Sequence, residues 1–135
     1  ELHALFRASQ AVMGELDLFR ILDHIVTEAA QIAGTQHVKI LLADAKTNSL
    51  RVAAQKGCHV PSEFQVPIGA SYSGRVAATG RLLFMANTQD DPDNLLRERD
   101  RREGLSSYLG LPIKIRGEVL GVLTFNSEAP RSYSE

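Results

Sequence analysis

The spacing of apolar residues near the N-terminus predicts an α-helix. Over residues 2–16 a set of positions recurs at alternating steps of three and four, which is the spacing of a coiled-coil seam: Leu2, Leu5, Ser9, Val12 and Leu16, of which only Ser9 is polar. Phe6 and Met13 widen the apolar stripe, so the same pattern also fits a helix that packs on its own domain. If the seam pairs with a second copy of the chain, the dimer-interface residues are Leu2, Leu5, Val12 and Leu16.

A second helix is expected directly after the first. Gly14 weakens the first helix near its end, and Asp17 suits an N-cap because its carboxylate can accept bonds from the free amides of a new first turn. Apolar residues keep helical spacing from Leu18 to Ala33, and Gly34 suits a C-cap. We therefore expect a linker or dimerisation helix at 1–16 and a separate domain at 17–135.

Residues 37–56 predict a β-hairpin, because two alternating runs flank the turn signal DAKTNS. Two further short strands are expected at 64–68 and 82–86. Between them, the segment 69–80 reads GASYSGRVAATG, and its serine, short apolar stripe and closing glycine predict a short helix with a serine cap.

Another helix is expected to begin at Asp91-Pro92, since Asp suits an N-cap and Pro the first helical position. Its segment RERDRRE alternates in sign and is typical of a solvated helix surface, with Glu98 and Arg102 spaced to pair.

The stretch GLPIKIRGEVLGVLTF, residues 110–125, predicts a closing hairpin with a three-residue turn at 116–118. Its second strand is apolar on both faces, and such a strand is covered on both faces. We therefore expect the N-terminal helices on one side of the sheet and the middle segment, about 60–105, on the other.

Composition narrows the functional classes. The chain has 135 residues, which suits one domain, and a net charge of −1 argues against nucleic acid as a partner. No apolar run approaches the roughly 18 residues of a membrane span, so membrane insertion is not expected. The single cysteine, Cys58, fits a reducing compartment, which indicates a cytoplasmic location. The chain does not begin with Met, and we expect it to be a segment of a longer protein.

No set of residues for catalysis or metal binding is apparent. The four histidines lie on different predicted elements, and the spacings of zinc ligands are missing. Asp90, Asp91 and Asp93 do not have the spacing of a calcium loop. We therefore expect no catalytic residues, no metal site and no enzymatic activity in this domain.

Four stretches, in this order, resemble a GAF domain. ELDLFRILDHIVTEAAQIAG resembles the first helix of the domain, and VPIGASYSGRVAATGRLLFMANTQDDP resembles its strand–helix–strand segment. SSYLGLPIKIRGEVLGVLTF resembles its last hairpin, and SEAPRSYSE resembles the entry to its closing helix. The resemblance covers nearly the whole chain.

The resemblance implies an α+β fold: a profilin-like antiparallel sheet of five or six strands with helices on both faces. It also implies a pocket on the sheet face opposite the terminal helices, and a small-molecule-sensing role within a larger bacterial signalling protein. By family frequency the parent is a sensor histidine kinase, and two copies pair through the terminal helices. The other interpretation is a structural dimerisation or relay module without a ligand, within a phosphodiesterase, diguanylate cyclase or transcription activator.

The family's known chemistries do not transfer to this chain. GAF-like proteins that reduce free methionine sulfoxide use several cysteines, and this chain has one. Phytochrome-like members attach a bilin on the segment that corresponds to 94–104, which has no cysteine here. The motif of cyclic-nucleotide binders does not occur, haem has no supporting motif, and no cofactor is assigned.

An unidentified small molecule thus remains as the expected partner in the implied pocket. A small-molecule site is mostly apolar, with a few polar groups that fix orientation. The candidate ligand-binding residues are Phe64, Ser71, Tyr72, Ser73, Val76, Phe84, Asn87, Arg97, Tyr108 and Leu111.

Overall fold

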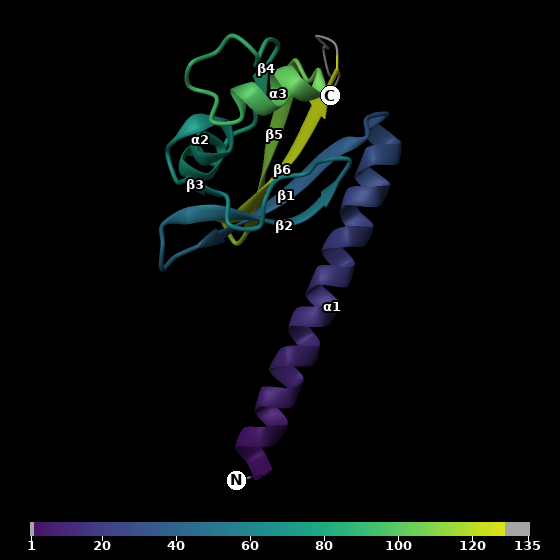
Figure 1. Cartoon of the computed structure of the whole chain (residues 1–135). Helices are drawn as coiled ribbons and strands as arrows, with labels where there is room; N and C mark the ends of the chain where they lie inside the picture. Colours follow the sequence, from purple (N-terminus) through teal and green to yellow (C-terminus); the bar gives the residue numbers. More distant parts are fainter. Residues whose placement is uncertain (1, 129–135) are drawn as a thin grey trace.

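A six-stranded antiparallel sheet, with strand order β3-β2-β1-β6-β5-β4, forms the centre of the computed structural model. Helix α1 lies on one face, and α2 with the segment leading to α3 lies on the other (Figure 1). The structure describes residues 2–128, with side chains from residue 17 onward. The elements are α1 (Leu2–Ala33), β1 (His37–Asp44), β2 (Ser49–Lys56), β3 (Gln65–Pro67), α2 (Ser71–Thr79), β4 (Leu83–Met85), α3 (Arg97–Glu103), β5 (Ser107–Ile115) and β6 (Glu118–Ser127).

The expected division of the N-terminus into two helices is wrong, because α1 is a single helix of 32 residues. Glycine in a helix interior costs only about 1 kcal/mol relative to alanine, and Gly14 does not interrupt the helix. Asp17 accordingly lies inside the helix and caps nothing. The N-terminal half of α1 projects past the end of the sheet (Figure 1). The side chains of the predicted seam, from Leu2 to Leu16, lie outside the described residues.

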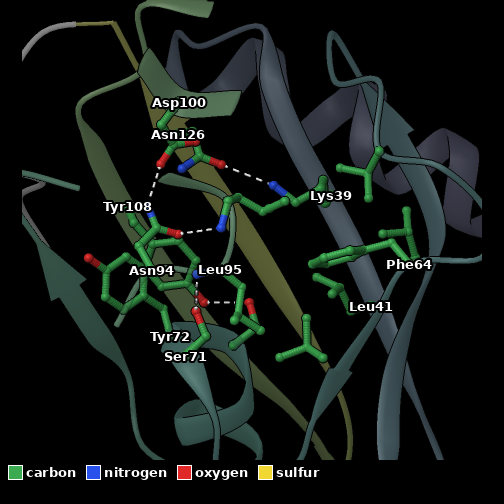
Figure 2. Close-up of a pocket in the computed structure, with 15 residues that line it drawn as sticks. Lys39, Leu41, Phe64, Ser71, Tyr72, Asn94, Leu95, Asp100, Tyr108 and Asn126 are labelled. Atoms are coloured by element: carbon green, nitrogen blue, oxygen red, sulfur yellow. Dashed lines mark hydrogen bonds between the residues drawn. The ribbon is translucent and has the colours of Figure 1, made fainter. Parts of the chain in front are cut away.

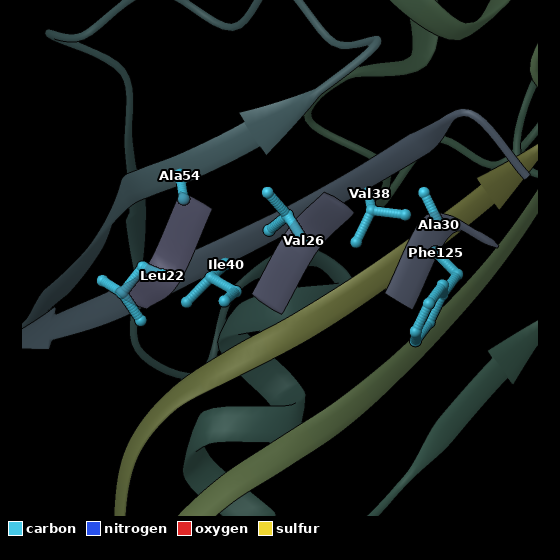
Figure 3. Close-up of a cluster of buried hydrophobic side chains, with 7 residues drawn as sticks. All are labelled: Leu22, Val26, Ala30, Val38, Ile40, Ala54 and Phe125. Carbon is cyan, nitrogen blue, oxygen red and sulfur yellow. The ribbon is translucent and has the colours of Figure 1, made fainter. Parts of the chain in front are cut away.

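One face of the sheet packs on the C-terminal half of α1 (Figure 3). Residues of α1 that are four positions apart lie on the same side of the helix, and their apolar side chains pack against alternate residues of the central strands. The core residues of this face are Leu22, Val26 and Ala30 from α1, Val38 and Ile40 from β1, Ala54 from β2 and Phe125 from β6.

The opposite face holds a second core under α2, made by Leu41, Leu50, Val66, Val76 and Val122. The strand β6 is therefore covered on both faces at Val122 and Phe125, as the sequence predicts. The prediction fails at Leu120, which is 38% exposed and lies at the β-bulge where the β5–β6 register shifts.

The β5–β6 turn has two residues and not the expected three, since Ile115 pairs directly with Glu118. Arg116 and Gly117 have φ values of 53° and 80°. Positive φ at both central residues is the requirement of the type I′ turn, whose twist matches that of the flanking strands.

The two short helices lie where the sequence places them, but they start differently. The N-cap of α2 is Ala70, which makes no side-chain cap hydrogen bond, so the expected serine cap is wrong. Helix α3 starts at Arg97 and not at Asp91-Pro92, because the Asp91 carboxylate accepts bonds from the Asp93 amide and the Tyr72 hydroxyl. The ion pair on α3 joins Arg99 to Glu103, one position after the expected pair.

Two further observations complete the fold. The entry to a closing helix, expected within 127–135, falls largely outside the described residues. Within the described part of the chain, no helix has the length and apolar character to cross a membrane.

The core under α1 can be tested with Ile40→Ala. Ile40 is 1% exposed, and truncation of such a residue costs about 2–5 kcal/mol of unfolding free energy through lost burial and the cavity left behind. Ile115→Ala is the matched control: this isoleucine is 57% exposed, and we expect a loss below about 1 kcal/mol. Urea denaturation of both variants provides the measurement, and equal losses would contradict the described core.

Candidate functional site

A pocket lies between the second face of the sheet and the segment that joins β4 to β5 (Figure 2). Its cavity volume is about 30 Å³. The cavity is lined by Lys39, Leu41, Val52, Val60, Phe64, Val66, Ser71, Tyr72, Ser73, Asn94, Leu95, Leu96, Asp100, Tyr108 and Asn126. The pocket is thus mixed: aliphatic residues and Phe64 line the β1–β2 side together with Lys39, and polar groups together with Leu95 and Leu96 line the remainder.

Lys39 is the buried cation of this pocket, with 6% of its surface exposed. It lies on β1, and its ammonium group donates to Asn126 Oδ1 on β6 at 3.1 Å. Asn126 Nδ2 in turn donates to the Ser107 carbonyl at 3.0 Å, which holds the amide in place. A charged amine is therefore fixed by a neutral partner on the neighbouring strand.

Asp100 is the buried acid of the same pocket. It lies on α3 with 4% of its surface exposed, and Asn94 Nδ2 donates to its Oδ2 at 2.8 Å. Burial raises the pKa of the Asp100 carboxyl, opposed by the hydrogen bond from Asn94 and by the charge of Lys39. Asn94 also donates to the Thr88 carbonyl and accepts from the Leu96 amide, so it holds the irregular segment before α3.

Two tyrosines form the wall beneath α2. Their rings lie 5.1 Å apart at an interplanar angle of 45°. The Tyr108 hydroxyl and Ser73 Oγ are hydrogen-bonded at 2.9 Å, and the Tyr72 hydroxyl donates to Asp91 at 2.5 Å. Burial is the first cause that raises the pKa of both phenols, so both hydroxyls remain protonated at neutral pH.

Helix α2 is positioned by close backbone contacts. A Cβ at Gly74 would lie 2.3 Å from the Pro67 carbonyl oxygen, so only glycine allows α2 to approach β3 this closely. Ser71, with a φ of 53°, accepts a hydrogen bond from the Leu95 amide at 3.1 Å. The start of α2 is thereby tied to the segment that closes the pocket.

The structure brings together five of the ten residues that the sequence nominates. Phe64, Ser71, Tyr72, Ser73 and Tyr108 line the cavity.

The other five lie elsewhere. Val76 is part of the second core, and Leu111 packs against the α1 core on the opposite face. Phe84 lies on β4 opposite Leu109, Asn87 is exposed beside Asp90, and Arg97 lines a separate shallow depression.

Sequence reasoning missed the four buried polar residues Lys39, Asn94, Asp100 and Asn126. The available signal was a lysine within the apolar run of β1 and an asparagine near the end of the mostly apolar β6. Asp100 gave no such signal, because it is one of seven charged residues in a row on α3. Its burial depends on how the preceding segment folds.

Cys58 is buried after β2, and its thiol lies 3.9 Å from the Val38 carbonyl. Burial raises the pKa of this thiol, which disfavours the reactive thiolate. Across the described residues, no three His, Cys, Asp or Glu side chains gather as metal ligands would.

The sequence matches a known domain family. The family model described as GAF domain matches residues 17–135, and the chain belongs to this family, whose members are generally regulatory and non-catalytic.

Similar proteins support a regulatory setting. The Nif-specific regulatory protein of Azospirillum lipoferum is 28% identical over 141 residues, which cover 98% of this chain and 22% of that protein. The chain thus spans about a fifth of the length of this relative.

Solved structures share the fold. A GAF domain from a phosphoenolpyruvate-protein phosphotransferase of Coxiella burnetii has a TM-score of 0.79 at 20% identity, covering 99% of this chain and 81% of that one. The GAF domain region of a putative membrane protein of Geobacter sulfurreducens has a TM-score of 0.74 at 27% identity, covering 93% and 86%.

The buried acid makes stability depend on pH. Burial raises the pKa of Asp100 in the folded state above its value in the unfolded state, so protonation of Asp100 favours folding. This contribution to the unfolding free energy is fully present below the unfolded-state pKa, and it is lost as the pH rises through the folded-state pKa. We expect the unfolding free energy of the wild type, minus that of Asp100→Asn, to grow as the pH falls from about 7 to about 4.

Urea denaturation at each pH measures this difference, and Asp23→Asn on the exposed side of α1 controls for removal of a carboxyl. A difference that shrinks on acidification would show that the folded state does not favour protonated Asp100.

Proposed function

We propose that this chain is a cytoplasmic, non-catalytic sensor domain that binds a small molecule between the sheet and α2, and transmits binding to α1. The observation that carries the proposal is the pocket itself, in which Lys39 and Asp100 are buried beside an apolar wall. Buried charges are costly, and a chain with no use for a pocket would be more stable with apolar residues there. Binding of a ligand would account for the presence of these two buried charges.

Strand β1 supplies a first physical route from the pocket to α1. Lys39 and Leu41 line the cavity, while Val38 and Ile40 pack on α1. A shift of β1 that accommodates a ligand therefore also moves the surface on which α1 lies.

Asn126 supplies a second route. Its side chain accepts from Lys39, and its backbone carbonyl accepts a hydrogen bond from Thr35 Oγ1 at 2.5 Å, two residues after α1 ends. The same residue thus contacts the pocket and the connection at the end of α1. Ligand binding regulates output only if the ligand has different affinities for two arrangements, and these contacts are the ones that would differ.

The relatives favour a transcription regulator as the parent protein over the sensor histidine kinase that family frequency suggests. They are Nif-specific regulatory proteins of two Azospirillum species, each similar over 98% of this chain. The output domain lies outside this chain on either interpretation.

A homodimer through α1 is the second part of the proposal. Four exposed apolar side chains of α1 follow steps of three, four and seven residues: Leu18, Ile21, Ile25 and Ile32. Ile32 is 86% exposed, and a stripe with this spacing suits the seam of a two-stranded coiled coil. When the three–four spacing predicted over residues 2–16 is extended along α1, it reaches Val26 and Ala30, which are buried against the sheet. The exposed stripe therefore lies on a different side of the helix from the extension of the predicted seam.

Ligand sensing predicts stabilisation by a metabolite. A ligand at about 100 times its dissociation constant adds about 2.7 kcal/mol to the unfolding free energy, which raises the thermal midpoint by several degrees. Thermal denaturation of the chain against a panel of small metabolites provides the test. If none raises the midpoint, and mass spectrometry of the purified protein finds no retained compound, the structural relay interpretation replaces this one.

Dimerisation predicts sensitivity to charge on the exposed stripe. The double variant Ile21→Glu, Ile25→Glu places like charges across the seam, and we expect it to sediment as a monomer where the wild type sediments as a dimer. Arg20→Glu changes the charge of the same helix off the stripe and should leave the dimer intact. A double variant that remains dimeric would exclude this surface as the interface.

A further inference from the structure

The ammonium group of Lys39 has unused hydrogen-bonding capacity inside the pocket. An ammonium group has three donors, and the structure gives Lys39 one acceptor, Asn126 Oδ1. No carboxylate of residues 17–128 forms an ion pair with it. Asp100 acts on Lys39 only at longer range, since its own hydrogen bond comes from Asn94. The pocket therefore contains a buried positive charge that lacks a direct negative partner.

The other polar groups of the pocket are already engaged within the protein. Ser73 pairs with Tyr108, and Tyr72 donates to Asp91. Asn94 uses both faces of its amide, donating to Asp100 and accepting from the Leu96 amide. The unused N–H donors of the Lys39 ammonium group are therefore available to an acceptor on a ligand. A negatively charged acceptor forms the strongest hydrogen bonds with them.

The rest of the wall near Lys39 is apolar. Leu41 follows on the same strand and Phe64 lies beside it, as Figure 2 shows. Val52, on β2, also lines this side. The cavity of about 30 Å³ has room for about two or three water molecules. A cavity of this size favours a short ligand with an anionic end and a small apolar end, and a ligand of more than about three non-hydrogen atoms requires the pocket side chains to move apart.

We propose that the pocket binds a short-chain monocarboxylate, whose carboxylate accepts hydrogen bonds from Lys39 Nζ and whose alkyl end packs against Leu41, Val52 and Phe64. This inference rests on the proposed sensor function and specifies the ligand class. Asp100 shares the pocket, and its negative charge limits affinity for an anion. Neutralising it strengthens binding, which gives the two charged residues effects of opposite sign.

Calorimetric titration of the 135-residue chain with acetate, propionate and butyrate tests the assignment. Propionamide and butyramide have the same shape without the charge, and nitrate is a planar anion without the alkyl end. We expect at least one carboxylate to bind, its amide to bind at least about tenfold more weakly, and nitrate to bind more weakly than the carboxylate.

Two nearly isosteric variants provide the sharper test. Lys39→Met keeps the aliphatic stem and should weaken carboxylate binding about tenfold to hundredfold. Asp100→Asn keeps an acceptor for Asn94 and should tighten binding several-fold. Far-UV circular dichroism and the thermal midpoint establish that each variant is folded, and a variant that fails this check is replaced by Lys39→Gln or Asp100→Ser.

The outcomes separate this inference from the sensor function. Equal binding of acid and amide, an unaffected Lys39 variant, weaker binding by Asp100→Asn, or nitrate binding as tight as that of the carboxylate overturns the assignment. If the metabolite panel yields a ligand that is not a carboxylate and does not depend on Lys39, the ligand class is wrong and the sensor function stands. If nothing binds, both fail.

Discussion

The packing of β1 on both faces is the constraint on which the rest of the structure depends. Side chains alternate along a strand, so Val38 and Ile40 point to α1 while Lys39 and Leu41 point to the pocket. The register with β6 places Val38 opposite Phe125 and Leu41 opposite Val122, which supports each face with a second strand. A shift of one residue would exchange the two faces and bury Lys39 under the helix.

Burying Lys39, Asp100 and their asparagine partners costs folding free energy, and the hydrogen bonds among these residues reduce that cost. Lys39 and Asp100 lie on elements distant in sequence, and each is held by an asparagine rather than by the other. Asn126 and Asn94 are fixed in turn by backbone groups of Ser107 and Thr88. Every bond holds a side chain near the cavity, so the network orders the pocket while leaving its cation partly unengaged.

The same asparagine on β6 links this network to the terminal helix through Thr35. On the proposed sensor function, this connection is where a local change at the pocket would reach the end of α1. The same proposal assigns the receiving surface to the exposed stripe on α1, a helix that projects past the end of the sheet (Figure 1). The pocket, β1, Asn126 and α1 thus form one contiguous physical path.

The sequence by itself determined the elements and the two-sided sheet. Alternation in 37–56 and 107–127 and helical spacing before Gly34 are local signals, and the double-sided apolar character of β6 required cover on both faces. Only the tertiary structure decided that α1 is continuous, that α3 starts at Arg97, and which residues line the pocket. Leu111 and Tyr108 are three residues apart on β5, so alternation places them on opposite faces, and only the tertiary structure decided which of the two faces holds the pocket. Asp100 has no local signature, because its burial depends on contacts with Asn94 that only the folded loop before α3 provides.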